Sequence, residues 1–76
     1  MNKARRKAIS NSLDKLIAAL PILKKALEAE KEAYSKIPDD EENEDRISAM
    51  EELIDNLDNA ISSLEDAIGT LEGADF

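Results

Sequence analysis

Residues 47–71 read ISAMEELIDNLDNAISSLEDAIGTL, and this stretch decides the fold. Apolar residues recur in it at alternating steps of three and four, which is the spacing of one stripe along an α-helix. In heptad notation the stripe consists of columns a and d, and a third apolar column, g, lies beside it. Column a is Ile47, Ile54, Ile61 and Ile68, column d is Met50, Leu57, Leu64 and Leu71, and column g is Leu53, Ala60, Ala67 and Ala74. Three apolar columns make a face too wide for a two-stranded coiled coil, so the stretch predicts one helix of a bundle.

The first half of the chain repeats the same heptad. Column a is Leu13, Leu20, Leu27 and Tyr34, column d is Ile9, Leu16, Leu23, Glu30 and Ile37, and column g is Ala19, Ala26 and Ala33. Column e holds Lys24 and Lys31 in this half but only carboxylates in the second half. Antiparallel helices bring column e against column e, so the charges favour an antiparallel hairpin, although each exposed ion pair adds only ~0–1 kcal/mol.

A short acidic loop joins the two predicted helices. Pro38 disfavours helical structure at the residue before it, and the carboxylates that follow suit the positive end of a helix dipole. We expect Asp39, together with Glu42, or Asn43 alone to cap the second helix. The prediction is therefore a single domain with helices over residues 3–36 and 44–72 and a loop over residues 37–43.

Two details of this hairpin stay open. The apolar columns allow one register that matches Leu27 with Leu57 and another that matches Leu27 with Met50, and the first is favoured because it leaves room for a longer loop.

Pro21 falls on the outer column b, and a proline inside a helix costs ~3 kcal/mol. Because the apolar rhythm continues through it in phase, we predict a kinked but continuous first helix. The alternative is a break at which Pro21 opens a new helix.

The composition excludes most catalytic chemistry. The chain of 76 residues contains no cysteine and no histidine, so it lacks the commonest general base, thiolate nucleophiles and most zinc ligands. The loop has the alternating oxygen ligands of a calcium site, but the positions that need glycine and a last carboxylate hold Glu44 and Met50. We expect neither an enzyme nor a metal or cofactor site.

A monomer of this size is marginally stable, so the all-α hairpin is expected to self-associate into a four-helix bundle or a larger homo-oligomer.

Charge is distributed unevenly along the chain. Residues 1–38 carry nine Lys/Arg and four Asp/Glu, whereas residues 39–76 carry one and fourteen. The opening stretch concentrates the cations, and the candidate ligand-binding residues are Lys3, Arg5, Arg6, Lys7, Tyr34 and Arg46. Cations oppose the dipole at the start of a helix, so this basic cluster indicates an anion site, for a phosphate or a nucleotide. The alternative is that Glu72, Asp75 and the terminal carboxylate offset it. Glu30, which stands in column d, indicates that the core is accessible to water near the loop, or it lines a small polar pocket with Tyr34 and Arg46.

The second helix presents a row of carboxylates. They are Glu44, Asp45, Glu51, Glu52, Asp55, Asp58, Glu65 and Asp66. Such a rod can imitate a nucleic-acid backbone and occupy the binding channel of another protein, or it is an ordinary solvated face. At a net charge of −8 a direct nucleic-acid partner is not expected. No apolar run reaches the roughly 20 residues of a membrane span, so the cytoplasm is the expected compartment.

The opening NKARRK, the proline-containing acidic loop and residues 49–68, AMEELIDNLDNAISSLEDAI, resemble small proteins encoded by phages and prophages of Gram-positive bacteria. Most members of that group have no assigned function, and the resemblance implies an accessory protein acting in the host. Three hypotheses follow. The chain sequesters a small anionic ligand such as a cyclic nucleotide signal of antiviral defence, it blocks a nucleic-acid-binding defence protein with its acidic face, or it is a purely structural coiled-coil protein.

Overall fold

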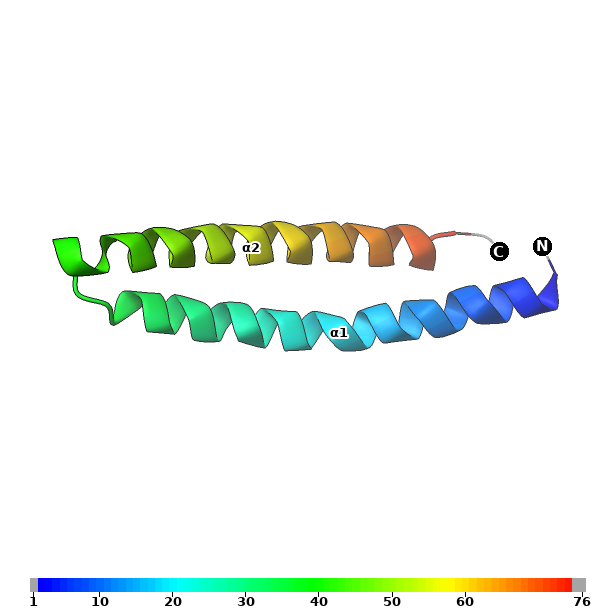
Figure 1. The fold of residues 1–76 in the computed structure, drawn as a ribbon. Coiled ribbons are helices and arrows are strands. Elements are labelled where there is room, and N and C mark those ends of the chain that lie inside the picture. Colours follow the sequence, from blue (N-terminus) through cyan, green and yellow to red (C-terminus); the bar gives the residue numbers. More distant parts are fainter. Residues whose placement is uncertain (1, 75–76) are drawn as a thin grey trace.

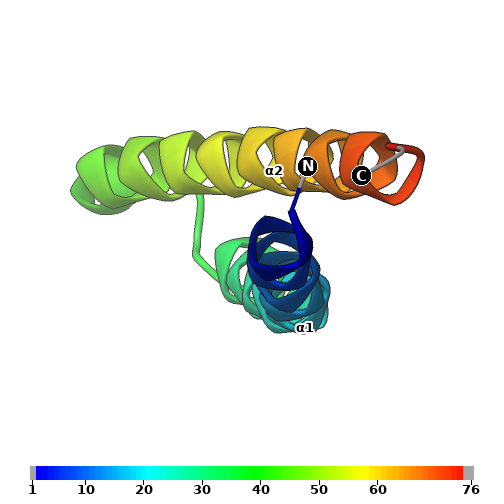
Figure 2. The same cartoon turned by 90° about the vertical axis from the view of Figure 1, so that its right-hand side faces the viewer.

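The protein folds as a hairpin of two long helices, as a computed structural model that describes residues 2–74 shows. Helix α1 spans Lys3–Ser35 and helix α2 spans Glu44–Glu72, and a single 3-10 turn, η1, covers Glu41–Asn43. The two helices run side by side in opposite directions (Figure 1). Seen from the end that carries the N-terminus, they form two layers with nothing packed on either one (Figure 2). The rod measures 59 × 16 × 14 Å.

The connection between the helices differs slightly from the predicted loop. Helix α1 ends one residue before the predicted boundary, because the N–H groups of Lys36 and Ile37 bond the carbonyls of Ala33 and Tyr34 in the tighter geometry of a last turn. Pro38 follows and cannot continue a helix. Turn η1 then reverses the chain within the predicted loop, immediately before α2 begins.

The predicted cap of α2 is wrong. The Asn43 side chain makes no capping bond to α2. Instead Asp40 caps turn η1, where its carboxylate accepts from the Asn43 backbone N–H at 3.1 Å and from Asn43 Nδ2 at 2.9 Å. The turn moves the start of helical hydrogen bonding three residues upstream, so the residue before the turn takes the role that was assigned to Asp39 or Asn43.

Helix α1 runs without interruption through Pro21, so the alternative of a break into two helices is wrong. The missing N–H of Pro21 leaves the carbonyl four residues earlier without its helical donor. The proline lies on the exposed side of α1, where water can reach that carbonyl. A kink at Pro21 stays a prediction.

The core of the hairpin is thin. Among residues 2–74 the buried apolar residues are Leu27, Ile61 and Ile68, with 7%, 5% and 7% of their surface exposed, while the other a and d residues of the two helices are half-buried. Each helix packs against only one other helix. A side chain at the helix–helix interface is therefore shielded from water by the neighbouring helix on one side and exposed to water on the other. Two helices of this length therefore leave their apolar face incompletely buried.

Two side-chain contacts between the helices identify the register. Lys24 Nζ lies 3.6 Å from Glu65 Oε2, and Tyr34 OH lies 2.6 Å from Glu51 Oε1. Both contacts agree with the register that matches Leu27 with Leu57. The other register, one heptad away, would set Tyr34 near the start of α2 and is excluded by the same contacts. In the observed register α1 continues past the end of α2 (Figure 1).

Candidate functional sites

The basic cluster lies in the part of α1 that extends past α2, and we call residues 3–8 of this part the overhang. All of these residues are exposed. Asn2 caps the helix, its side chain accepting from the Arg5 N–H at 2.8 Å. Among residues 2–74 no carboxylate lies within salt-bridge distance of the four cations, and Glu72 is therefore not their partner. Asp75 and the terminal carboxylate lie outside the described residues.

Helical geometry divides this cluster into two parts. At about 100° per residue, Lys3, Arg6 and Lys7 fall within an arc of about 100°, whereas Arg5 lies about 100° from Arg6 on its other side. The three grouped cations share the direction of columns e, a and b, and Arg5 belongs to column g. A compact ligand can therefore contact Lys3, Arg6 and Lys7 together, while Arg5 faces a different surface.

The first turn of α1 has no acidic residue, so its positive dipole end meets only positive side chains. Such an arrangement costs a few tenths of a kcal/mol per charge. The backbone adds few donors at the same end, because the Arg5 and Arg6 N–H groups already bond the side chain and the carbonyl of Asn2, which leaves the N–H groups of Lys3 and Ala4. Positive side chains and N–H groups at a helix start together favour an anion.

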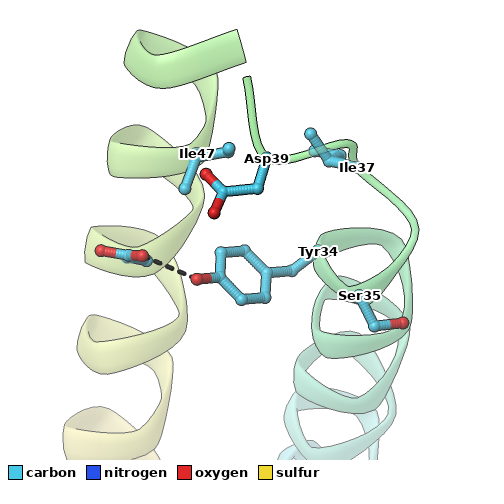
Figure 3. A pocket seen from close by; sticks show the side chains of 6 residues that line it. Tyr34, Ser35, Ile37, Asp39 and Ile47 are labelled. Carbon is cyan, nitrogen blue, oxygen red and sulfur yellow. Dashed lines mark hydrogen bonds between the residues drawn. The ribbon is translucent and has the colours of Figure 1, made fainter. Parts of the chain in front are cut away.

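A pocket at the opposite end of the rod surrounds Tyr34. It has a volume of about 320 Å3 and is lined by Tyr34, Ser35, Ile37, Asp39, Ile47 and Glu51. Figure 3 shows the Tyr34 ring between the two helices, with its hydroxyl directed at Glu51 and the Asp39 carboxylate above it. Neither Glu30 nor Arg46 is among the lining residues. The polar pocket that the sequence suggested is thus built from other residues, and its two carboxylates make it unsuitable for an anion.

The hydrogen bond to Glu51 raises the pKa of the Tyr34 hydroxyl above its ordinary value of 10.0, and partial burial and the charges of Glu51 and Asp39 act in the same direction. A negative charge next to the hydroxyl favours its neutral form. Tyr34 is therefore a neutral donor that connects the two helices. The predicted ligand-binding residues do not form one site in a single chain, because Tyr34 and Arg46 lie at the loop end and the basic cluster lies at the other.

The predicted acidic face is exposed along the whole of α2. Of its eight carboxylates, Glu65 pairs with Lys24 and Glu51 accepts from Tyr34, and the described residues offer the other six no cation within salt-bridge distance. A shallow second pocket of about 340 Å3 at the loop is lined by Asp39, Asp40, Glu41 and Glu44. Within the described chain no group of three or more acidic residues has the arrangement of a metal site.

One side of the hairpin, which the sequence interpretation overlooked, is almost free of charge. Because the Lys24–Glu65 pair joins the two e columns on one side, the g columns share the other side, where column c lies next to them. The uncharged side, as we call it, exposes Ile22, Ala26, Ala29 and Ala33 of α1 and Ala49, Leu53, Asn56, Ala60, Ser63, Ala67 and Thr70 of α2. No carboxylate occupies column c or g in either helix, and the charged residues there are cations: Arg5, Lys36 and Arg46 near the ends of the rod, and Lys15 within the first half of α1.

Two large apolar side chains stand on this uncharged side. Ile22 is 69% exposed and Leu53 is 44% exposed. Ile17 is also 42% exposed, but it belongs to column e on the opposite, charged side. The sequence did contain a sign of the uncharged side, because alanines and Ile22 recur at steps of three and four over residues 19–33. Column c was not among the columns assigned to the core, so this surface was not predicted.

Comparisons with family models, with curated proteins and with solved structures find no match to this chain. In the part of the chain that the structure describes, neither helix is both long enough and apolar enough to cross a membrane.

Proposed function

We propose that the protein is a non-enzymatic, self-associating binding protein that captures a small anionic ligand with Lys3, Arg6 and Lys7. One observation carries the proposal. These three cations share one side of an exposed overhang, and no described carboxylate neutralises them. They oppose the helix dipole, so their position costs stability rather than adding to it. A binding role accounts for cations that the fold itself does not need.

The chemistry of the cluster favours a phosphate group. An arginine guanidinium makes two parallel hydrogen bonds to phosphate oxygens, and lysine adds a mobile point charge. The N–H groups of Lys3 and Ala4, which the Asn2 cap does not occupy, add donors of fixed direction. A cyclic nucleotide presents such a phosphate on a compact body, and sequestering a nucleotide signal would suit an accessory protein that counters host antiviral defence. The resemblance to small phage proteins supports this setting.

Self-association is part of the same proposal. The a, d and g columns together are wider than the contact between two helices, and most of column g is exposed in one hairpin. A four-helix bundle built from two copies would cover these columns. It would also bring further basic overhangs into one particle and so raise the number of ligands that each particle holds.

Isothermal titration calorimetry tests the ligand. The panel consists of cyclic mononucleotides and dinucleotides, with inorganic phosphate as the minimal anion, at 50 mM and 300 mM salt. We expect saturable binding of at least one nucleotide that Arg6→Ala with Lys7→Ala abolishes. Because the removed cations opposed the helix dipole, the melting temperature of this variant should stay unchanged or rise slightly. The matched control, Lys25→Ala with Lys31→Ala, changes net charge equally and should retain binding.

Two results would contradict the proposal. One is the absence of heat with every compound at protein concentrations of hundreds of micromolar. The other is a loss of binding in the Lys25/Lys31 control that equals the loss in the Arg6/Lys7 variant, because the ligand would then respond only to overall charge.

A second function has its own supporting observation, which is the row of six carboxylates on α2 that have no cation within salt-bridge distance among residues 2–74. It would block a basic, nucleic-acid-binding channel of a host protein. Docking through many exposed charges weakens steeply as salt rises. A pull-down with a purified DNA-binding protein at two salt concentrations tests it, and Asp55→Asn with Asp58→Asn should weaken the complex. If neither ligand nor protein binds, the purely structural hypothesis remains.

A further inference from the structure

The hairpin exposes more surface than a compact protein of its mass. Its accessible surface is 5873 Å2, whereas the general scaling of surface with mass gives about 4,600 Å2 for 8.4 kDa. The excess, roughly 1,300 Å2, is of the order of the area that one partner contributes to a stable interface. A single side of a rod 59 Å long and 16 Å wide offers on the order of 900 Å2, close to the ~800 Å2 per partner of a standard interface.

We infer that a second copy of this chain covers the uncharged side and runs antiparallel to the first. The inference rests on the self-association proposed above and adds which side is covered and in which direction the copies run. No carboxylate has to be desolvated on this side, whereas the opposite side would bury the exposed carboxylates of column e, and burying unpaired charge is costly. The covered side is therefore the one without carboxylates.

The uncharged side is also complementary to itself. Ile22 of α1 and Leu53 of α2 project from it, and the neighbouring residues of columns c and g along each helix are alanine, apart from Asn56 beside Leu53. A two-fold axis makes the same surface serve both partners, so a large side chain of one copy can lie against a small residue of the other. Alternating large and small residues is how facing layers of a helical core interdigitate.

The charges at the two ends of the rod favour an antiparallel orientation of the two copies. The basic cluster gives the overhang a net charge of +4. The loop end, residues 36–46, holds two cations and six carboxylates, a net charge of −4. An antiparallel pair sets each overhang beside the partner's loop end, whereas a parallel pair sets like against like at both ends. Arg5, in column g, belongs to the uncharged side and would approach the partner, while Lys3, Arg6 and Lys7 belong to columns e, a and b and stay available to a ligand.

The covered side is tested by placing a carboxylate on it. Sedimentation velocity of the wild-type chain at 10–200 µM should give twice 8.4 kDa or a larger multiple. Ile22→Glu should reduce the mass to 8.4 kDa, and because Ile22 is 69% exposed in the hairpin the helical circular dichroism should persist. Ala60→Glu should act in the same way. The matched control, Asn59→Glu, adds the same charge on the acidic side and should leave the mass unchanged.

The direction is tested by cross-linking, which is clean because the chain has no cysteine. A variant with both Ala8→Cys and Ala33→Cys, treated with a short bismaleimide, should form covalent dimers efficiently. Either single variant should form few, because the antiparallel arrangement keeps identical residues at opposite ends of the rod. Efficient dimers from Ala8→Cys alone would show a parallel pair and overturn the direction.

A wild-type chain that stays at 8.4 kDa throughout the concentration range would overturn the inference. So would an Ile22→Glu variant that keeps the wild-type mass, because the second copy would then lie elsewhere. The Arg6→Ala with Lys7→Ala variant should keep the wild-type mass. Loss of anion capture and loss of the dimer are therefore separate results, and the two proposals can fail independently.

Discussion

Gly69 is the residue whose replacement gives the sharpest test of the packing. It lies inside α2, its φ is negative, and a Cβ built on it meets nothing within 4 Å. Alanine restricts the unfolded chain more than glycine does and favours a helix interior by about 0.8–1 kcal/mol. Because the new methyl group meets no clash, we expect Gly69→Ala to deliver nearly the whole of this gain.

The expected change in melting temperature follows from the chain length. At about 2.1 cal/mol/K per residue, the 76 residues give an unfolding entropy of roughly 160 cal/mol/K. A gain of about 1 kcal/mol therefore raises the melting temperature by about 6 °C. Thermal unfolding followed by circular dichroism measures it, at one fixed protein concentration because self-association makes the midpoint depend on concentration.

Gly73 supplies the matched control. It ends α2 with φ −83° and ψ −7°, so alanine is not strained there, and its Cβ would meet the Gly69 carbonyl oxygen at an ordinary 3.5 Å. A residue at a helix end gains only a few tenths of a kcal/mol from helix propensity. Gly73→Ala should therefore raise the midpoint by less than Gly69→Ala.

The sign of the Gly69→Ala effect also tests which side of the hairpin is covered. Gly69 is in column b, away from the uncharged side. A lower melting temperature for Gly69→Ala would mean that another copy packs closely against this glycine, and the assignment of the docking side would be refuted. No change at all would refute the assumption that α2 is fully helical at this turn.

Further predictions follow from single residues. The absorbance of Tyr34, the only tyrosine, should titrate above pH 10.0, and Glu51→Gln should lower the midpoint of this titration. The free energy of unfolding that the raised pKa provides is present below pH 10 and is lost as pH rises through the folded-state pKa. Pro21→Ala should raise the free energy of unfolding by up to ~3 kcal/mol in urea titrations, and a decrease would mean that the proline packs against a partner. Lys24→Ala should cost less than ~1 kcal/mol in the same assay, because its ion pair is exposed. Leu64→Asp should abolish the helical circular dichroism, because it places a charge at the interface between the two helices. A folded variant would show that the interface around Leu64 is accessible to water.

The helices and their direction could be predicted because they depend on repeating features. The heptad columns recur often enough that no single residue decides them, and the Lys24–Glu65 contact is an example of the e-against-e pairing that predicted an antiparallel hairpin. Lys31 was expected to meet a carboxylate in the same way, and none of the described residues provides one within salt-bridge distance. Individual exposed ion pairs are weak, so their pattern predicts orientation better than it predicts any one contact.

The loop and the pocket could not be predicted with the same accuracy. Whether Asp39, Asp40 or Asn43 caps the turn depends on one 3-10 turn, and several neighbouring residues have side chains able to cap. The Tyr34–Glu51 hydrogen bond joins an a residue to an e residue of the other helix, a pairing that a column-by-column comparison does not consider. Both features are decided by the local geometry of single side chains, which the periodic pattern does not contain.

The same electrostatic preference acts within one chain and between two chains. Folding as a hairpin sets the cationic half of the sequence against the anionic half, and it leaves an overhang of +4 and a loop end of −4 at opposite ends of the rod. Exposed charges are screened beyond about 10 Å at 0.1 M salt, whereas burial of Ile22 and Leu53 does not depend on such screening. High salt should therefore leave the dimer largely intact but make its direction less exclusive. Cross-linking of Ala8→Cys alone should then rise with salt, and the salt dependence separates the charge that orients the copies from the apolar contact that holds them together.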